Sequence, residues 1–131
     1  MNVGRVLAVT AGGAFASAVG VLVVGTAWVG RSYYLLPRAE REGHELNAML
    51  APGASVGVLL GLVGTALMMA MLLYTLRKVW VRARWLGPPS RWLAFHVICG
   101  IGGPACIVLH AGLTWPRGLV AIGFWCMVLV A

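Results

Sequence analysis

Two histidines in one apolar stretch are the residues of this sequence best suited to chemistry. His96 and His110 are fourteen positions apart. A helix rises ~1.5 Å per residue, so this spacing separates them by about 21 Å along the axis. Fourteen steps of ~100° fall about 40° short of four full turns, so both imidazoles lie on nearly the same face. Because imidazole nitrogens are normal axial ligands of haem iron, the pair predicts two haems, one near each side of a bilayer.

The residues between the histidines predict room for such flat ligands. Gly100, Gly103 and Ile107 lie on the same helical stripe. Glycine costs a helix roughly 1 kcal/mol relative to alanine, so the run that includes Gly102 must be supported by tertiary contacts, from a porphyrin edge or from a closely crossing helix. Pro104 removes an intrahelical hydrogen bond, and a kink is expected there.

Haem propionates need cationic partners near the membrane interfaces. Arg91 lies just outside the first histidine and Arg117 just outside the second, so both are candidate partners. Their alternative role, as snorkelling or topology-setting cations, fits equally well. The sequence lacks Cys-x-x-Cys-His, which excludes covalently attached haem. The cysteines, at positions 99, 106 and 126, are expected to be small core residues.

Composition sets the class of protein. The chain has 131 residues, of which 61% are hydrophobic and 10% charged. A soluble domain of this size could not bury so much apolar surface, so we expect one integral membrane domain over residues 1–131, in contact with the lipid bilayer. The net charge of +7 does not indicate nucleic-acid binding, because the basic residues gather where membrane topology places them.

Four apolar segments predict an all-α membrane bundle, over residues 6–30, 54–76, 92–115 and 118–131. The first three reach the roughly 20 residues that a span needs. The fourth is too short, so it is either a re-entrant or half-buried end or, as we favour, an incomplete span of a longer chain. A signal peptide is the less favoured alternative for the first, because its apolar run exceeds the usual length. Small residues, at positions 12, 16 and 20 of the first segment and 57, 61 and 64 of the second, predict close helix packing.

The loops predict the orientation. Residues 77–91 contain five basic residues and no acid, whereas residues 31–53 contain three arginines and three glutamates. The positive-inside rule then places the N-terminus and the 77–91 loop in the cytoplasm. A bacterial inner membrane is the expected location. Trp92 and Trp115 would mark the two interfaces.

A resemblance supports the haem interpretation. The stretch from Arg91 to His96, the run 100–104 and His110 together resemble the haem-bearing helix of membrane b-type cytochromes, closest to the ferric-reductase-like group and its bacterial relatives. Segments 33–37 and 73–78 are also similar to that bacterial group. The resemblance implies two b haems, one per leaflet, with His96 as the cytoplasmic-side ligand and His110 as the outer-side ligand.

The sequence departs from that family in one respect. Those cytochromes supply the opposing ligands from a second helix with its own histidine pair, and the only other histidine here is His44, in the loop predicted to face outward. His44 either reaches the outer haem or is a solvated loop residue, and we favour the loop. The remaining ligands are expected from a continuation of the chain, another subunit or a second copy, and five-coordinate haem is the further alternative.

Three functions compete at this point. The first is membrane electron transfer by b-type haem, at most as the membrane part of an oxidoreductase. The second is a non-catalytic accessory subunit of a respiratory or photosynthetic complex, with histidines that bond neighbouring helices or bind a chlorophyll-type pigment. A small transporter or channel is disfavoured, since no acid follows Glu45 and the membrane segments have no carboxylate.

Overall fold

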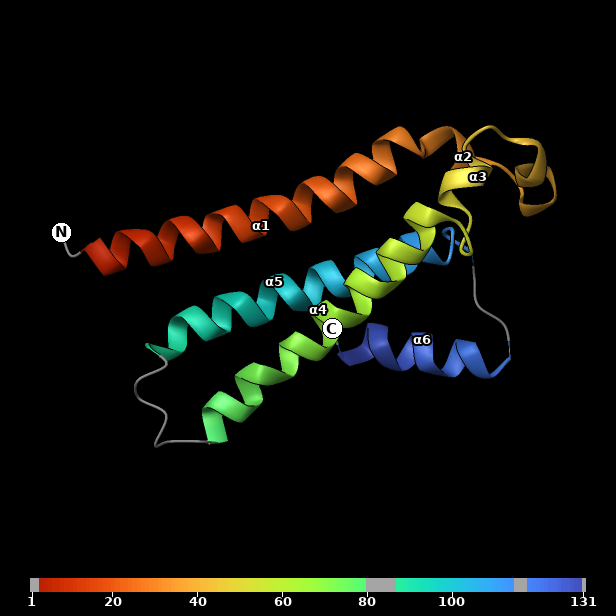
Figure 1. Ribbon diagram of the computed structural model, residues 1–131. Coiled ribbons are helices and arrows are strands. Elements are labelled where there is room, and N and C mark those ends of the chain that lie inside the picture. Colours follow the sequence, from red (N-terminus) through yellow and green to blue (C-terminus); the bar gives the residue numbers. More distant parts are fainter. Residues whose placement is uncertain (1–2, 80–86, 115–117, 131) are drawn as a thin grey trace.

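The computed structural model describes residues 3–79, 87–114 and 118–130 (Figure 1), and these residues form helices and no strand. In chain order the elements are α1 (Val3–Val29), α2 (Arg31–Leu35), the 3-10 helix η1 (Arg38–Gly43), α3 (Asn47–Leu50), α4 (Ser55–Val79), α5 (Pro89–His110) and α6 (Leu119–Val130).

The described part of the chain has three helical segments long and apolar enough to cross a membrane. They are Val9–Val29, Asn47–Val79 and Pro89–His110. This confirms the predicted all-helical class, and the three helical segments have the length and apolarity expected of the first three predicted spans. The fourth apolar segment forms α6, a helix of 12 residues, so its part in a longer span stays a prediction. The orientation across the membrane also stays a prediction.

The third helix is shorter than predicted at its carboxyl end. α5 ends at His110 instead of continuing to residue 115. The reason is local backbone geometry, because Gly112 and Leu113 have φ angles of 70° and 54°, in the left-handed region that stops a helix. Trp115, the proposed interface marker, lies outside the described residues. Pro104, where a kink was expected, does not interrupt the helix.

The antiparallel pair of α4 and α5 forms the centre of the molecule (Figure 1). The two helices meet most closely at Gly64 and Gly103. A Cβ added at Gly64 would lie 3.0 Å from the carbonyl oxygen of Gly103, and one added at Gly103 would lie 3.2 Å from that of Gly64. Only glycine permits this approach, so the small-residue seam predicted in the second span is confirmed. The fully buried side chains of the pair are Leu60, Cys99 and Cys106.

α1 packs against this pair along one stripe only. Phe15 stacks on Phe95 of α5 with ring centroids 5.3 Å apart, and Val19 covers Gly102. No described residue packs closely against the small-residue seam predicted on α1, because a Cβ added at Gly12 or Gly20 would have nothing within 4 Å, so its role in helix packing stays a prediction. Gly12 lies close to the stripe of Phe15 and Val19 around the helix, whereas Gly20 lies about 100–140° away from it.

A buried arginine holds the connection between α1 and α4 to the end of α5. Arg41 is 8% exposed. Its guanidinium donates to the carbonyl oxygens of Leu36 at 2.9 Å, Tyr34 at 2.8 Å and Gly112 at 2.6 Å. A cation beside the last carbonyls of a helix is also favoured by the helix dipole. From the sequence, Arg41 is only one of the loop charges. Its role in holding the connection to the end of α5 depends on the fold.

Candidate functional site

Both candidate ligands point from α5 toward the backbone of α4. His96 Nδ1 lies 3.0 Å from the carbonyl oxygen of Met71, and His110 Nδ1 lies 2.7 Å from the carbonyl oxygen of Gly57. The prediction that the two histidines share one face of one helix is thereby confirmed, and the face they share is the one that packs on α4.

The two contacts are arranged symmetrically about the glycine crossing. His96 precedes Gly103 by seven residues and His110 follows it by seven, while their acceptors on α4 lie seven residues to either side of Gly64. Seven residues are nearly two helical turns, so each side chain returns to the partner helix. An antiparallel pair therefore repeats the same histidine–carbonyl contact at two depths.

These contacts determine the ring tautomers. A carbonyl oxygen can only accept a hydrogen bond, so Nδ1 must carry a proton and donate it. In the neutral imidazole the lone pair is then on Nε2. For both rings, Nδ1 is the only nitrogen to which the structure gives a hydrogen bond with a described residue. A histidine that ligates a metal through one nitrogen usually donates the other N–H to a carbonyl or carboxylate.

His44 has the opposite arrangement. Its Nδ1 accepts a hydrogen bond from the backbone N–H of Leu46 at 3.1 Å, and its ring lies edge-on to Tyr33. The neutral ring then carries its proton on Nε2, which leaves no lone pair for a metal. His44 is therefore a residue of the loop, as we favoured from the sequence, and its ring stabilises the local turn.

The surroundings of the two rings differ. Tyr74 lies beside His96, with ring centroids 5.1 Å apart and an angle of 45° between the planes. Gly61 lies directly under His110, where an added Cβ would be 3.0 Å from Nδ1. The sequence predicts Gly61 only as part of a helix-packing seam. In the structure Gly61 also makes space for the imidazole of His110.

The glycines expected to cradle haem face α4. A Cβ added at Gly103 would lie 2.8 Å from Met68 Cγ, and one added at Gly100 would lie 3.4 Å from Met71 Sδ. Of the two supports considered for this glycine run, the closely crossing helix is the one present. The donor chemistry of the histidines fits axial ligation. Haem would have to lie outside the interface of α4 and α5, and Gly100 and Gly103 as cofactor contacts stay a prediction.

The remaining predicted residues are two arginines and three cysteines. Arg91 lines a groove between α5 and α1, whereas His96 faces α4. Arg117 lies outside the described residues. Cys99 and Cys106 are buried as expected, but Cys126 is exposed, so that part of the cysteine prediction is wrong. The reason is that α6 makes few contacts with the other helices.

The described residues contain no group of three or more His, Cys, Asp or Glu side chains that could hold a metal ion. No protein-family model, curated protein or solved structure matches the chain.

Proposed function

We propose that this chain is a membrane electron-transfer subunit in which His96 and His110 each present Nε2 as an axial ligand to b-type haem. The observation that supports it is the pair of Nδ1–H bonds to main-chain carbonyls of α4. Bound haem would supply reversible one-electron transfer at each of two depths in the membrane.

The protein's part in this function is to prepare two nitrogens. The carbonyl oxygens of Met71 and Gly57 fix the tautomer and the orientation of the rings. A hydrogen bond from Nδ1 also makes the opposite nitrogen more basic, which strengthens an axial bond. Because main-chain carbonyls inside a helix pair move little, the rings are oriented before any ligand arrives.

The opposing ligands must come from elsewhere. We place them on a second copy, on another membrane subunit or on a continuation of the chain, in a bacterial inner membrane. α1 is consistent with such association, because Gly13 and Gly20, seven residues apart on one face of the helix, have nothing within 4 Å of an added Cβ. A small-residue surface of this kind lets another helix approach closely. Electron donor and acceptor would belong to those partners.

The proposal is tested with asparagine in place of each histidine. Asparagine keeps an N–H donor near the position of Nδ1 but has no nitrogen lone pair for iron. We would record dithionite-reduced minus oxidised spectra of the complex purified with its native partners, for the unmodified protein, His96→Asn and His110→Asn. His44→Asn is the matched control. The expected result is a b-type α-band that falls by about half in each single variant.

Retention of the full band in both His96→Asn and His110→Asn would refute the proposal, as would a colourless unmodified complex. A band lost equally in His44→Asn would contradict the tautomer argument. Helix content, measured by circular dichroism, distinguishes a lost ligand from a lost fold.

A structural accessory subunit is the second candidate, and one observation favours it. The two histidine–carbonyl bonds are complete without any ligand and flank the Gly64–Gly103 crossing evenly. Under this alternative the imidazoles hold two helices together in a larger complex. The complex would then show no haem band, and alanine at either histidine would destabilise it while asparagine would not. Red absorption in place of a haem band would indicate a chlorophyll-type pigment.

A further inference from the structure

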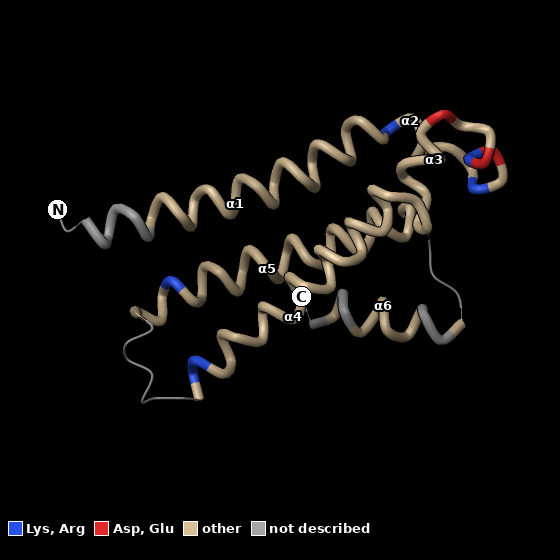
Figure 2. Tube along the Cα trace, viewed as in Figure 1, with Lys and Arg blue, Asp and Glu red and all other residues tan. Residues whose placement is uncertain are grey.

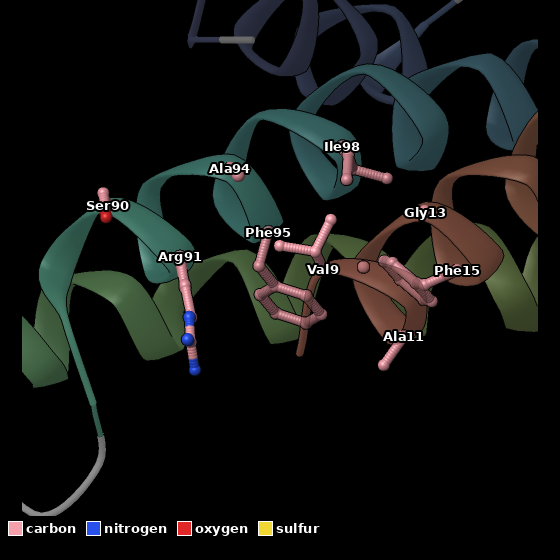
Figure 3. Close-up of a pocket in the computed structure, with 10 residues that line it drawn as sticks. Val9, Ala11, Gly13, Phe15, Ser90, Arg91, Ala94, Phe95 and Ile98 are labelled. Atoms are coloured by element: carbon pink, nitrogen blue, oxygen red, sulfur yellow. The ribbon is translucent and has the colours of Figure 1, made fainter. Parts of the chain in front are cut away.

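A groove of about 540 Å³ separates the N-terminal halves of α1 and α5. This volume lies within the roughly 300–1,000 Å³ of ligand sites. Figure 3 shows Phe15 of α1 and Phe95 of α5 within it, with Arg91 toward the beginning of α5. The other lining residues are Val9, Ala11, Gly12, Gly13, Ser90, Ala94 and Ile98.

The groove is apolar along its walls and cationic at one end. Ser90 and Arg91 are its polar lining residues, and both lie in the first turn of α5. That turn has no side-chain cap and no acidic residue, so the helix dipole adds to the positive charge. An occupant must therefore be apolar over most of its length and anionic where it meets Arg91.

Charge at this end of the molecule is of one sign. Arg77 and Lys78, at the end of α4, lie at the same end as Arg91, while the acidic residues lie in the connection after α2 at the far end (Figure 2). The described residues at the basic end include no carboxylate, so a second copy aligned in parallel would bring more cations to Arg91 rather than a partner for it. The bilayer offers the matching molecule.

We propose that this groove binds one acidic phospholipid, with an acyl chain along α1 and α5 and the headgroup phosphate at Arg91 and Ser90. Guanidinium groups bind phosphate through paired hydrogen bonds, and the positive end of the helix dipole favours an anion. Gly12 and Gly13 provide the space for the chain, since a Cβ added at either would have nothing within 4 Å. The lipid would fill the gap between two helices that otherwise touch along a single stripe.

The test counts lipids that remain on the protein. The unmodified chain in detergent would be mixed with equal amounts of phosphatidylglycerol and phosphatidylcholine with identical acyl chains, and bound molecules would be counted by native mass spectrometry. We expect one phosphatidylglycerol to be retained in preference to phosphatidylcholine. Arg91→Gln should lower that preference about fivefold, the effect of one basic residue near a membrane surface. Arg77→Gln is the control for general surface charge.

A second pair of variants tests the groove itself. Gly12→Leu would fill it without a clash, so retention of both lipids should fall while helix content stays unchanged. Gly20→Leu is the control on α1. A Cβ added at Gly20 would also have nothing within 4 Å, but Gly20 does not line the groove, so lipid retention should be unchanged. Equal losses in Arg91→Gln and Arg77→Gln would refute the phosphate site. Equal retention in Gly12→Leu and Gly20→Leu, or a change of oligomeric state in Gly12→Leu with no loss of lipid, would refute the acyl-chain site.

Discussion

Replacing Gly103 by alanine tests whether the glycine crossing holds α4 and α5 together. The added Cβ would lie 2.8 Å from Met68 Cγ, 3.2 Å from the carbonyl oxygen of Gly64 and 3.3 Å from the backbone nitrogen of Met68. The first distance is shorter than real Cβ contacts allow, and the other two involve backbone atoms of α4. The helices must therefore move apart, and the histidine bonds on either side of the crossing must lengthen.

The magnitude follows from two opposing terms. Overpacking a closely packed interior costs about 1–3 kcal/mol. Alanine gains about 1 kcal/mol over glycine in helix propensity. Gly20→Ala on α1 gains the same propensity but meets nothing within 4 Å. The difference between the two variants therefore isolates the overpacking term, and Gly103→Ala should be less stable than Gly20→Ala by about 1–3 kcal/mol.

The assay is reversible unfolding in mixed micelles with increasing fractions of sodium dodecyl sulfate, followed by circular dichroism. We expect the transition of Gly103→Ala at a lower fraction than that of the unmodified protein, and that of Gly20→Ala at an equal or higher one. Equal transitions for the two variants would show that α4 and α5 are not held at this crossing, and the symmetry argument for the histidines would fail with it.

Four other substitutions have defined outcomes. Arg41→Gln should destabilise the protein by about 2–4 kcal/mol in the same assay. Hydrogen bonds from a charged donor are worth about 1.5–3 kcal/mol each, and glutamine replaces only some of the three that Arg41 makes. A change below about 1 kcal/mol would contradict the role of Arg41 in holding this connection to the end of α5. Tyr34→Phe should leave stability unchanged or raise it by about 1–3 kcal/mol, because the Tyr34 hydroxyl is buried with no partner among the described residues. Tyr33→Phe should lower stability by about 1 kcal/mol, because the Tyr33 hydroxyl donates a hydrogen bond to Asn47. Burial also raises the pKa of Tyr34, so the unmodified protein should lose stability relative to Tyr34→Phe as the pH rises above about 10. Gly61→Ala should displace the His110 ring and weaken one of two haem bands while the other stays, and equal loss of both bands would contradict the assignment of one haem to each histidine.

The sequence predicts the spans better than the contacts between them. Apolar length is a property of each segment, so three membrane helices could be recognised from composition and spacing alone. The shared face of His96 and His110 followed from helical periodicity for the same reason. The element that covers that face belongs to another part of the chain, so α5 alone does not identify it. The glycine run of α5 is compatible both with a cofactor and with a crossing helix. The choice of α4 could not be made from α5 by itself.

Two other features required the fold. Arg41 is one of three arginines in its loop, and nothing in its local sequence distinguishes it from Arg38, which is exposed. Its burial depends on Gly112, 71 residues away. The end of α5 at His110 was missed because Ala111, Gly112 and Leu113 continue the apolar run, while the left-handed backbone that stops the helix has only a single glycine as its signal.

Arg91 and His96 lie on different faces of α5, so the haem and lipid proposals can be tested separately. The residues are five apart, which places their side chains about 140° apart around the helix. His96 accordingly contacts α4 while Arg91 lines the groove beside α1. A lipid at Arg91 and a haem at His96 would therefore use different surfaces, and Arg91→Gln should reduce lipid retention without shifting a haem band. If the same variant instead shifts the band at the His96 depth, Arg91 serves a propionate as the sequence first indicated, and the groove has a different occupant.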